Sequence, residues 1–347
     1  MKSLKDISWN VPESEYRQDP ALSYSTLAKF ERGGFNSLSH LFDKVESPSL
    51  TFGSAVDSII TGGMTEFNER FKVCDFSITD GGASVCRLLS TKYKDVYKAF
   101  KDIPEDIVSA IAQEAGFWKD PKWNKKRYSE VLKTGNVELF YESLANSDLT
   151  IIDRKTYDDV LNAVRVLKSS DATRFYFAND NPFDGVERYY QLKFKANLNG
   201  IDYRIMADLI MVNHKEKTIQ MIDLKTSSHN EWEFYKSFVD WGYNWQARLY
   251  SRVFKVNMIK DEYFKDFTML PYLFIVVNRN SLTPLVWRFE DTFVEGTLTY
   301  GKKSPVEMRD PEDIGKDLHQ YLTTAYAVPI GIKTDSPNSI TQYLNSL

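Results

Sequence analysis

In the first half of the chain, hydrophobic residues recur three and four positions apart, as they do in amphipathic helices. The stretch SYSTLAKFERGG at 23–34 ends in two glycines that stop a helix, and residues 151–171 repeat the helical spacing. No internal repeat or low-complexity linker interrupts this region. The pattern predicts a mainly helical N-terminal part, which we assign to residues 1–180.

From Glu187 the hydrophobic period changes to two, which indicates β-strands. Residues 187–212 predict two strands joined by an Asn199-Gly200 turn, a strong hairpin signal. The polar stretch NHKEK at 213–217 predicts a second turn before a third strand. The remaining predicted elements are a strand at 218–228, a helix at 243–256, strands at 271–278 and 283–290, and a helix at 311–327.

This order of elements predicts one α/β domain spanning residues 1–347. Residues 181–300 supply the sheet and one helix, and residues 301–347 supply a C-terminal helix and tail.

Composition narrows the class of protein. With 347 residues, 42% hydrophobic and 27% charged, the chain is typical of a soluble globular protein. It has neither an apolar run of about 18 residues nor a signal-peptide pattern, so we expect a cytoplasmic protein without a membrane partner. Cys74 and Cys86 are too few for an iron–sulfur cluster, and no phosphate-binding glycine loop suggests ATP. The net charge of −4 leaves DNA binding to a local basic surface.

The third predicted strand contains MIDLKTSS at 221–228, which places two opposite charges in an apolar run. Asp223 and Lys225 are two apart and therefore share a face of the strand. If the preceding turn closes symmetrically near residues 215 and 216, Asp208 lies beside Asp223. Two adjacent carboxylates favour a divalent cation, and their oxygens suit Mg²⁺ or Mn²⁺. The alternative is a structural ion pair between Asp208 and Lys225.

A second motif follows 21 residues after Lys225. Gln246 and Tyr250 form a Q-x-x-x-Y pattern, whose spacing places both side chains on one face of a helix. With these motifs the chain resembles the PD-(D/E)XK nuclease superfamily, its RecB-like branch, and most narrowly the RecE-type phage exonucleases. The matching segments are 23–30, 52–57, 151–177, Glu187, 207–209, 223–226 and 246–250, so the resemblance covers about residues 20–290.

The resemblance implies a restriction-endonuclease-like core, a mixed central sheet flanked by helices. It makes Asp208, Asp223 and the Leu224 carbonyl metal ligands and Lys225 the catalytic lysine, which would orient or deprotonate water or contact the phosphate. Glu187 matches an acidic residue that lies near the metal or its waters in the family. The hairpin register, however, places Gln191 opposite Asp208.

The two motif residues on the predicted helix, Gln246 and Tyr250, would support the lysine or contact DNA. For Tyr250, simple packing on the sheet is an equal alternative. Where RecB-like nucleases carry G-x-x-x-H, this chain has Gly53-Ser-Ala-Val-Asp57. Asp57 could replace the histidine ligand with a harder oxygen ligand, or it could be a helix N-cap or a surface residue.

Two further groups of residues are candidates for a role. The stretch FWKDPKWNKKRY at 117–128 could line a DNA strand, although a solvated loop with inward-packed tryptophans is favoured. The histidines at 40, 214, 229 and 319 are expected to be solvated surface residues.

The resemblance implies a metal-dependent exonuclease that digests linear duplex DNA from its ends, 5′ to 3′, in phage-type recombination. A single-strand annealing recombinase would be a partner, and a ring-shaped homo-oligomer would fit the family. The alternatives are a nuclease-fold protein that binds DNA or a partner without cutting, and an endonuclease with the same site.

Overall fold

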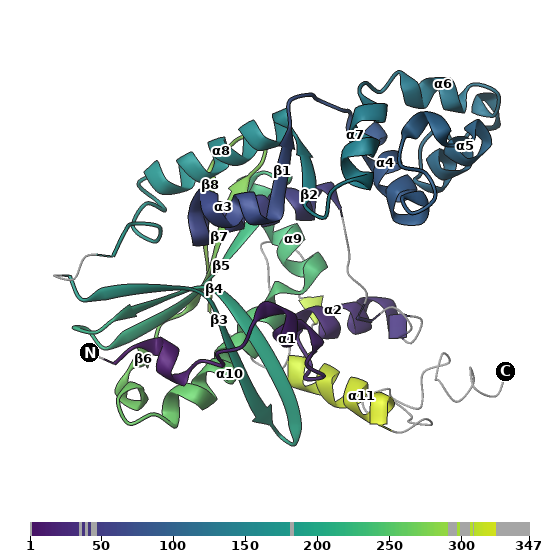
Figure 1. The fold of residues 1–347 in the computed structure, drawn as a ribbon. Coiled ribbons are helices and arrows are strands. Elements are labelled where there is room, and N and C mark those ends of the chain that lie inside the picture. The colour runs from purple at the N-terminus through teal and green to yellow at the C-terminus, as the bar shows by residue number, and fades with distance from the viewer. Residues whose placement is uncertain are drawn as a thin grey trace. The chain divides into compact units, whose positions relative to one another are not determined.

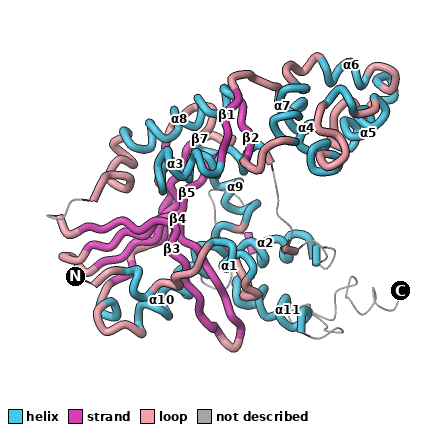
Figure 2. The backbone as a smooth tube through the Cα atoms, viewed as in Figure 1, coloured by secondary structure: helices cyan, strands magenta, loops and turns pink. Residues whose placement is uncertain are grey.

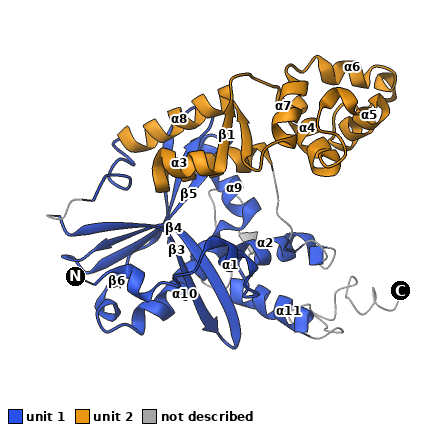
Figure 3. Cartoon of the chain, in the orientation of Figure 1, with its two compact units in different colours: residues 1–44, 171–347 blue, residues 45–170 orange. Residues whose placement is uncertain are grey.

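In the computed structural model the described residues are 2–34, 37–38, 41–42, 47–180, 184–290, 297–298, 306–307 and 309–323. The chain divides into unit 1, Met1–Lys44 with Asp171–Leu347, and unit 2, Val45–Ser170 (Figure 3). The sequence predicted one domain with a helical part over 1–180. The structure instead divides that part between the two units, and each unit contains a cluster of buried apolar side chains.

The main sheet of unit 1 has the strand order β3-β4-β5-β7-β8, with β6 paired to β5. Its strands are β3 Val186–Leu198, β4 Ile201–Asn213, β5 Thr218–Ser227, β6 Thr268–Met269, β7 Tyr272–Asn278 and β8 Pro284–Phe289. β5 pairs in parallel with β6 and β7, and the other pairs are antiparallel. A separate pair, β9 Thr297–Leu298 and β10 Val306–Glu307, is antiparallel. The predicted strands over 187–290 are confirmed.

The predicted hairpin turn is also confirmed. Asn199 and Gly200 have φ values of 53° and 88°, the left-handed conformations that a two-residue hairpin turn requires. The resulting β3–β4 hairpin extends well past the other strands (Figure 2).

The helices of unit 1 accompany this sheet. The α-helices are α1 Glu13–Gln18, α2 Tyr24–Gly33, α9 Phe234–Trp241, α10 Tyr243–Ile259 and α11 Pro311–Thr323, and the 3₁₀ helices, labelled η, are η1 Leu4–Ile7, η5 Glu231–Glu233 and η6 Phe264–Asp266. α2 begins with a capping box between Ser23 and Thr26. It ends at Gly33 with Gly34 as its C-cap, so the predicted Gly-Gly stop is confirmed. Residues 324–327 of the last predicted helix lie outside the described residues.

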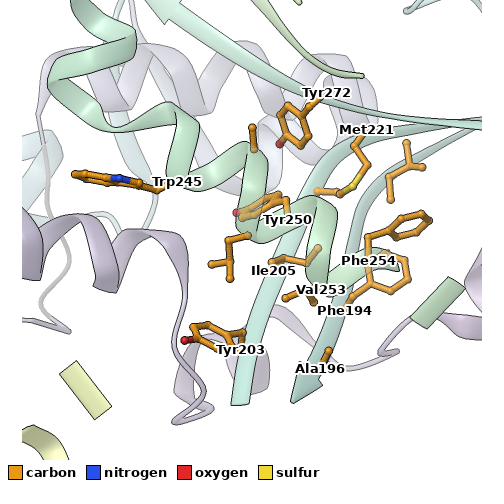
Figure 4. Close-up of a cluster of buried hydrophobic side chains, with 14 of the residues drawn as sticks. Phe194, Ala196, Tyr203, Ile205, Met221, Trp245, Tyr250, Val253, Phe254 and Tyr272 are labelled. Atoms are coloured by element: carbon orange, nitrogen blue, oxygen red, sulfur yellow. The ribbon is translucent and has the colours of Figure 1, made fainter. Parts of the chain in front are cut away.

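α10 lies along the β3–β4 hairpin (Figure 1). Its apolar side chains, including Val253 and Phe254, pack against Phe194 and Ile205 of the hairpin (Figure 4). This burial fixes the helix that carries Gln246.

Unit 2 is mainly helical, as predicted for this region. It contains α3 Pro48–Arg70, β1 Phe71–Cys74, α4 Asp80–Tyr93, η3 Phe100–Asp102, α5 Glu105–Glu114, η4 Pro121–Trp123, α6 Arg127–Leu132, α7 Val137–Ala145, β2 Thr150–Asp153 and α8 Arg154–Ser169. The sequence missed the parallel pair of β1 and β2. The predicted helix from residue 151 begins only at Arg154, because β-branched Ile151 and Ile152 extend into β2 and Asp153 caps α8 through the Thr156 amide.

Unit 1 therefore has a mixed sheet flanked by helices, which confirms the α/β part of the predicted fold class. The restriction-endonuclease-like core stays a prediction. Every helix in the described part of the chain is too short or too polar to cross a bilayer.

Candidate active site

The charged residues of MIDLKTSS lie where β4 and β5 separate. Backbone pairing between these strands reaches Leu209 and Ile222, the rung next to Asp208 and Asp223, so the predicted register is confirmed. Beyond that rung β5 continues with β7 alone. There the Asp208 carboxylate replaces a backbone acceptor, because its Oδ2 accepts the Leu224 N–H at 2.9 Å.

The separation coincides with a distortion of the β3–β4 hairpin. Gln191 has a φ of 53°, unusual for a residue with a side chain, and the rung between Gln191 and Asp208 is missing from the ladder. The side chains in this core cluster are Ile201, Tyr203, Ile205, Ala207, Ile210 and Val212 from β4, and Tyr189, Leu192, Phe194, Ala196 and Leu198 from β3. The spacing of two therefore becomes three on both strands at this rung, while the register of the pair is the same on either side of it. That change of spacing is a sequence signal that the periodicity argument missed.

The separation of β4 from β5 also determines what the backbone groups of Leu224 face. In a strand, the N–H and C=O of one residue point toward the same neighbouring strand. Since the Leu224 N–H points to Asp208, its carbonyl faces the same side, where the backbone of β4 has separated from β5. This orientation suits the carbonyl for a ligand beside Asp208.

Asp223 is the most buried charged group of the site, with 2% of its side chain exposed. Its Oδ1 accepts a hydrogen bond from Nε2 of Gln246 on α10. Its Oδ2 lies 2.6 Å from Nζ of Lys225. The ion pair in the structure therefore joins Lys225 to Asp223, whereas the sequence-based alternative had paired it with Asp208.

Lys225 lies between a carboxylate and an aromatic face. Its ammonium is 4.8 Å from the centroid of the Tyr243 ring, and 19% of its side chain is exposed. Burial acts to lower the pKa of Lys225, but the charges of Asp223, Tyr243 and Asp208 outweigh it and raise the pKa above the ordinary value for lysine. Without a metal, the Lys225 side chain is therefore an ammonium.

The chemistry of these groups fits a hard divalent cation. Asp208, Asp223 and Lys225 have a summed formal charge of −1, and Asp223 is buried whereas the other two are partly exposed. Within the described residues, no three histidine, cysteine, aspartate or glutamate side chains gather into a metal-binding group. Unit 1 would thus supply two carboxylates and one carbonyl as ligands, which suits Mg²⁺ because this ion usually keeps several waters.

The structure does not bring Glu187 to this group. Glu187 pairs with Val212, four residues from Asp208, or about 13 Å along the strand. Its carboxylate instead accepts a hydrogen bond from the Tyr189 hydroxyl and lies 3.1 Å from Nε2 of His214. Desolvation opposes ionisation, but the contacts with Tyr189 and His214 prevail and lower the pKa of Glu187.

That arrangement corrects the expectation for one histidine. His214 has only 3% of its side chain exposed, and its Nδ1 lies 3.0 Å from the Tyr263 hydroxyl. It is a buried, hydrogen-bonded residue because two polar partners satisfy the ring. His319 is exposed, as expected.

The two motif residues of α10 have different surroundings. Gln246 reaches Asp223, whereas Tyr250 is 9% exposed and packs edge-on against Tyr272 with ring centroids 6.4 Å apart (Figure 4). Burial raises the pKa of Tyr250 well above its ordinary value. This environment favours the packing interpretation of Tyr250.

Asp57 lies in α3 of unit 2, well inside the helix, whose N-cap is Ser47. The N-cap alternative for Asp57 is therefore wrong, and its role as a metal ligand stays a prediction.

Two residues near Lys225 were not predicted as site residues. Tyr243 precedes Gln246 by three positions, a spacing that places both on one helix face and could have revealed it. The Tyr24 hydroxyl donates to the Trp241 carbonyl at 2.7 Å, and desolvation raises the pKa of Tyr24 although the charge of Lys225 opposes the rise.

No protein-family model and no curated protein matches the chain. Among solved structures, a candidate exonuclease from Eubacterium rectale matches at 12% identity and a TM-score of 0.43, over 82% of this chain and 79% of that chain. A protein from Vibrio cholerae matches at 11% identity and a TM-score of 0.15, over 57% of this chain and 45% of that chain. Both TM-scores are below the level of a shared fold.

Proposed function

We propose that this protein is a Mg²⁺- or Mn²⁺-dependent nuclease that hydrolyses phosphodiester bonds of DNA. One observation carries the proposal: Asp208 and Asp223 flank the Leu224 backbone where two strands separate, and Lys225 contacts one of the two carboxylates. A purely structural ion pair would need only one carboxylate for one lysine. The second carboxylate lies beside Asp223, and two adjacent carboxylates support a divalent cation at this place.

Asp208, Asp223 and the Leu224 carbonyl would hold the ion. When bound, Mg²⁺ supplies a Lewis acid that polarises a phosphate and lowers the pKa of water. The protein's own groups hold the ligands in place: the Leu224 amide orients Asp208, and Gln246 orients Asp223.

Lys225 brings a positive charge to the half-exposed end of β5, where a phosphate could approach. Its position between Asp223 and the Tyr243 ring restricts its movement. In this proposal Lys225 orients the attacking water or contacts the scissile phosphate.

The finer part of the proposal is that the enzyme is an exonuclease. The order of the motifs, a D-x-K strand followed by a Q-x-x-x-Y helix, resembles the RecE-type enzymes. By this analogy, digestion runs 5′ to 3′ from the end of a linear duplex and leaves a 3′ strand for an annealing recombinase.

The second candidate is a DNA-binding protein that does not cut. The observation in its favour is the 2.6 Å contact between Lys225 and Asp223, which neutralises the more buried carboxylate without a metal. An endonuclease with the same site is the third candidate.

One assay separates these candidates. The purified protein is incubated with closed-circular duplex and with linear duplex labelled at the 5′ or the 3′ end, in Mg²⁺, Mn²⁺ or chelator. Metal-dependent loss of the linear duplex, with the 5′ label released first and circles spared, is expected. Cutting of circles at a comparable rate would identify an endonuclease. Intact DNA in every metal would leave the non-cutting protein.

A further inference from the structure

A basic loop in unit 2 has no part in the proposed catalytic site. Residues 119–127 contain five basic residues and one acidic residue, in a chain whose net charge is −4. Lys119, Lys122, Lys125 and Lys126 are all exposed. Lys122 lies 3.2 Å from Asp120, and the other three lysines have no ion pair with any residue that the structure describes.

Hydrogen bonds from a buried arginine hold the loop in its conformation. Arg127 is 5% exposed, and its Nε and Nη2 donate to the Trp118 carbonyl at 3.1 and 3.0 Å. Nη2 also donates to Oδ1 of Asn124 at 2.9 Å. The Asp120 side chain accepts the Lys122 amide at 2.9 Å. The fifth basic residue is thus a structural clamp, and the four lysines remain outside.

The conformation of this loop has two features that are energetically unfavourable. Trp118 has a φ of 51°, a conformation that costs a bulky residue free energy. The closely spaced lysines repel one another. Phe117, Trp118 and Tyr128 pack toward the core of unit 2, as the sequence favoured, but Trp123 stays half-exposed below the Lys122 ammonium, 5.6 Å away. A loop that only had to be solvated would need neither the strain nor the concentration of charge.

We propose that the loop at 118–127 is a binding surface for the phosphate backbone of duplex DNA. Its lysines supply the sequence-independent charge that such binding uses, and the Arg127 clamp reduces the entropy lost on binding. The choice of DNA among polyanions rests on the proposed function. The binding itself requires no cleavage and no metal.

The experiment compares two charge-matched triple variants of the full chain. The first is Lys119→Gln, Lys125→Gln and Lys126→Gln, which leaves Arg127 in place. The control is Lys101→Gln, Lys155→Gln and Lys168→Gln, which removes the same charge from three dispersed, exposed lysines of unit 2 without a described ion pair. Circular dichroism establishes that each variant is folded.

Binding is measured by fluorescence anisotropy with a labelled duplex of about 30 base pairs in chelator, between about 50 and 300 mM NaCl. Each lost phosphate contact should reduce the slope of log K against log salt by about 0.9, so the loop variant should show a slope shallower by about two to three. Its affinity at low salt should fall at least tenfold. The control should keep the wild-type slope.

Equal effects of both triples, no change in slope, or no DNA binding by the wild type would each overturn the inference. Its failure is distinguishable from failure of the proposed function. Loss of binding in the loop variant of a protein that cuts no DNA would support the loop and reject the nuclease. Unchanged binding by the loop variant, together with metal-dependent cleavage by the wild type, would reject the loop as a DNA-binding surface and support the nuclease.

Discussion

The carboxylate of Asp208 accepts the backbone N–H of Leu224 at 2.9 Å, in the place where strand β4 no longer pairs with β5. This one hydrogen bond links Asp208 to Leu224, the residue that separates Asp223 from Lys225 in the sequence. It also leaves the Leu224 carbonyl directed to the same side. Asp208 therefore has both a structural and a proposed catalytic task, and substitution can separate the two.

Asp208→Asn and Asp223→Asn are both expected to reduce metal-dependent cleavage at least about a hundredfold, because each removes a ligand charge with almost no change of shape. Their stabilities should differ. Asparagine at 208 can still accept the Leu224 amide, so unfolding in urea should be unchanged or slightly harder. Asparagine at 223 leaves Lys225 without its counter-ion and should cost about 1–3 kcal/mol. Wild-type turnover in either folded variant would remove the metal-site assignment.

Gln246 and Tyr250 provide a matched pair on one helix. Gln246→Leu removes the hydrogen bond to Asp223, and we expect kcat to fall about tenfold or more while the Michaelis constant for DNA changes little. Tyr250→Phe keeps the ring that packs on Tyr272 and should stay close to wild type. A large loss of kcat in Tyr250→Phe would instead assign the hydroxyl a role in the reaction.

Glu187→Gln tests whether the family position or the observed contacts describe this residue. Cleavage should persist, because Glu187 lies with His214 and Tyr189 rather than beside Asp208. Since folding lowers the pKa of Glu187, its contribution to stability is present above its unfolded pKa, about 4.3, and is lost as the pH falls through the lower folded value. Urea unfolding of the variant should therefore be easier at pH 7 and equal to wild type in strong acid. Loss of cleavage with unchanged stability would return Glu187 to the active site.

If Asp57 is the further ligand that the sequence predicts, Asp57→Ala should weaken Mg²⁺ binding, so that cleavage falls at low Mg²⁺ and partly recovers at high Mg²⁺. Asp57→His should keep activity and shift preference toward Mn²⁺. Glu69→Ala, which removes an exposed charge from α3 beyond its kink at Gly63, is the control and should leave the titration unchanged. If Asp57→Ala titrates like this control, Asp57 is not a ligand.

Local patterns in the sequence are sufficient to predict several parts of this protein. Alternation of two predicted the strands, and Asn199-Gly200 fixed the hairpin register because few residues adopt the required positive φ. The turn at 213–217 then placed Asp208 next to Asp223 by counting residues along the two strands. The helical spacing placed Gln246 on a helix face.

Contacts between residues far apart in the sequence determined the features that local patterns did not predict. The division into two units depends on which apolar side chains are buried together, a choice that local periodicity does not make. The distortion at Gln191 and Asp208 arises where both strands change face, and there the Asp208 side chain of β4 accepts a hydrogen bond from the β5 backbone. The burial of His214 and the partner of Lys225 likewise follow from groups brought together by folding. Sequence patterns determine which side chains share a face of a helix or strand, whereas tertiary packing determines which residues that face contacts.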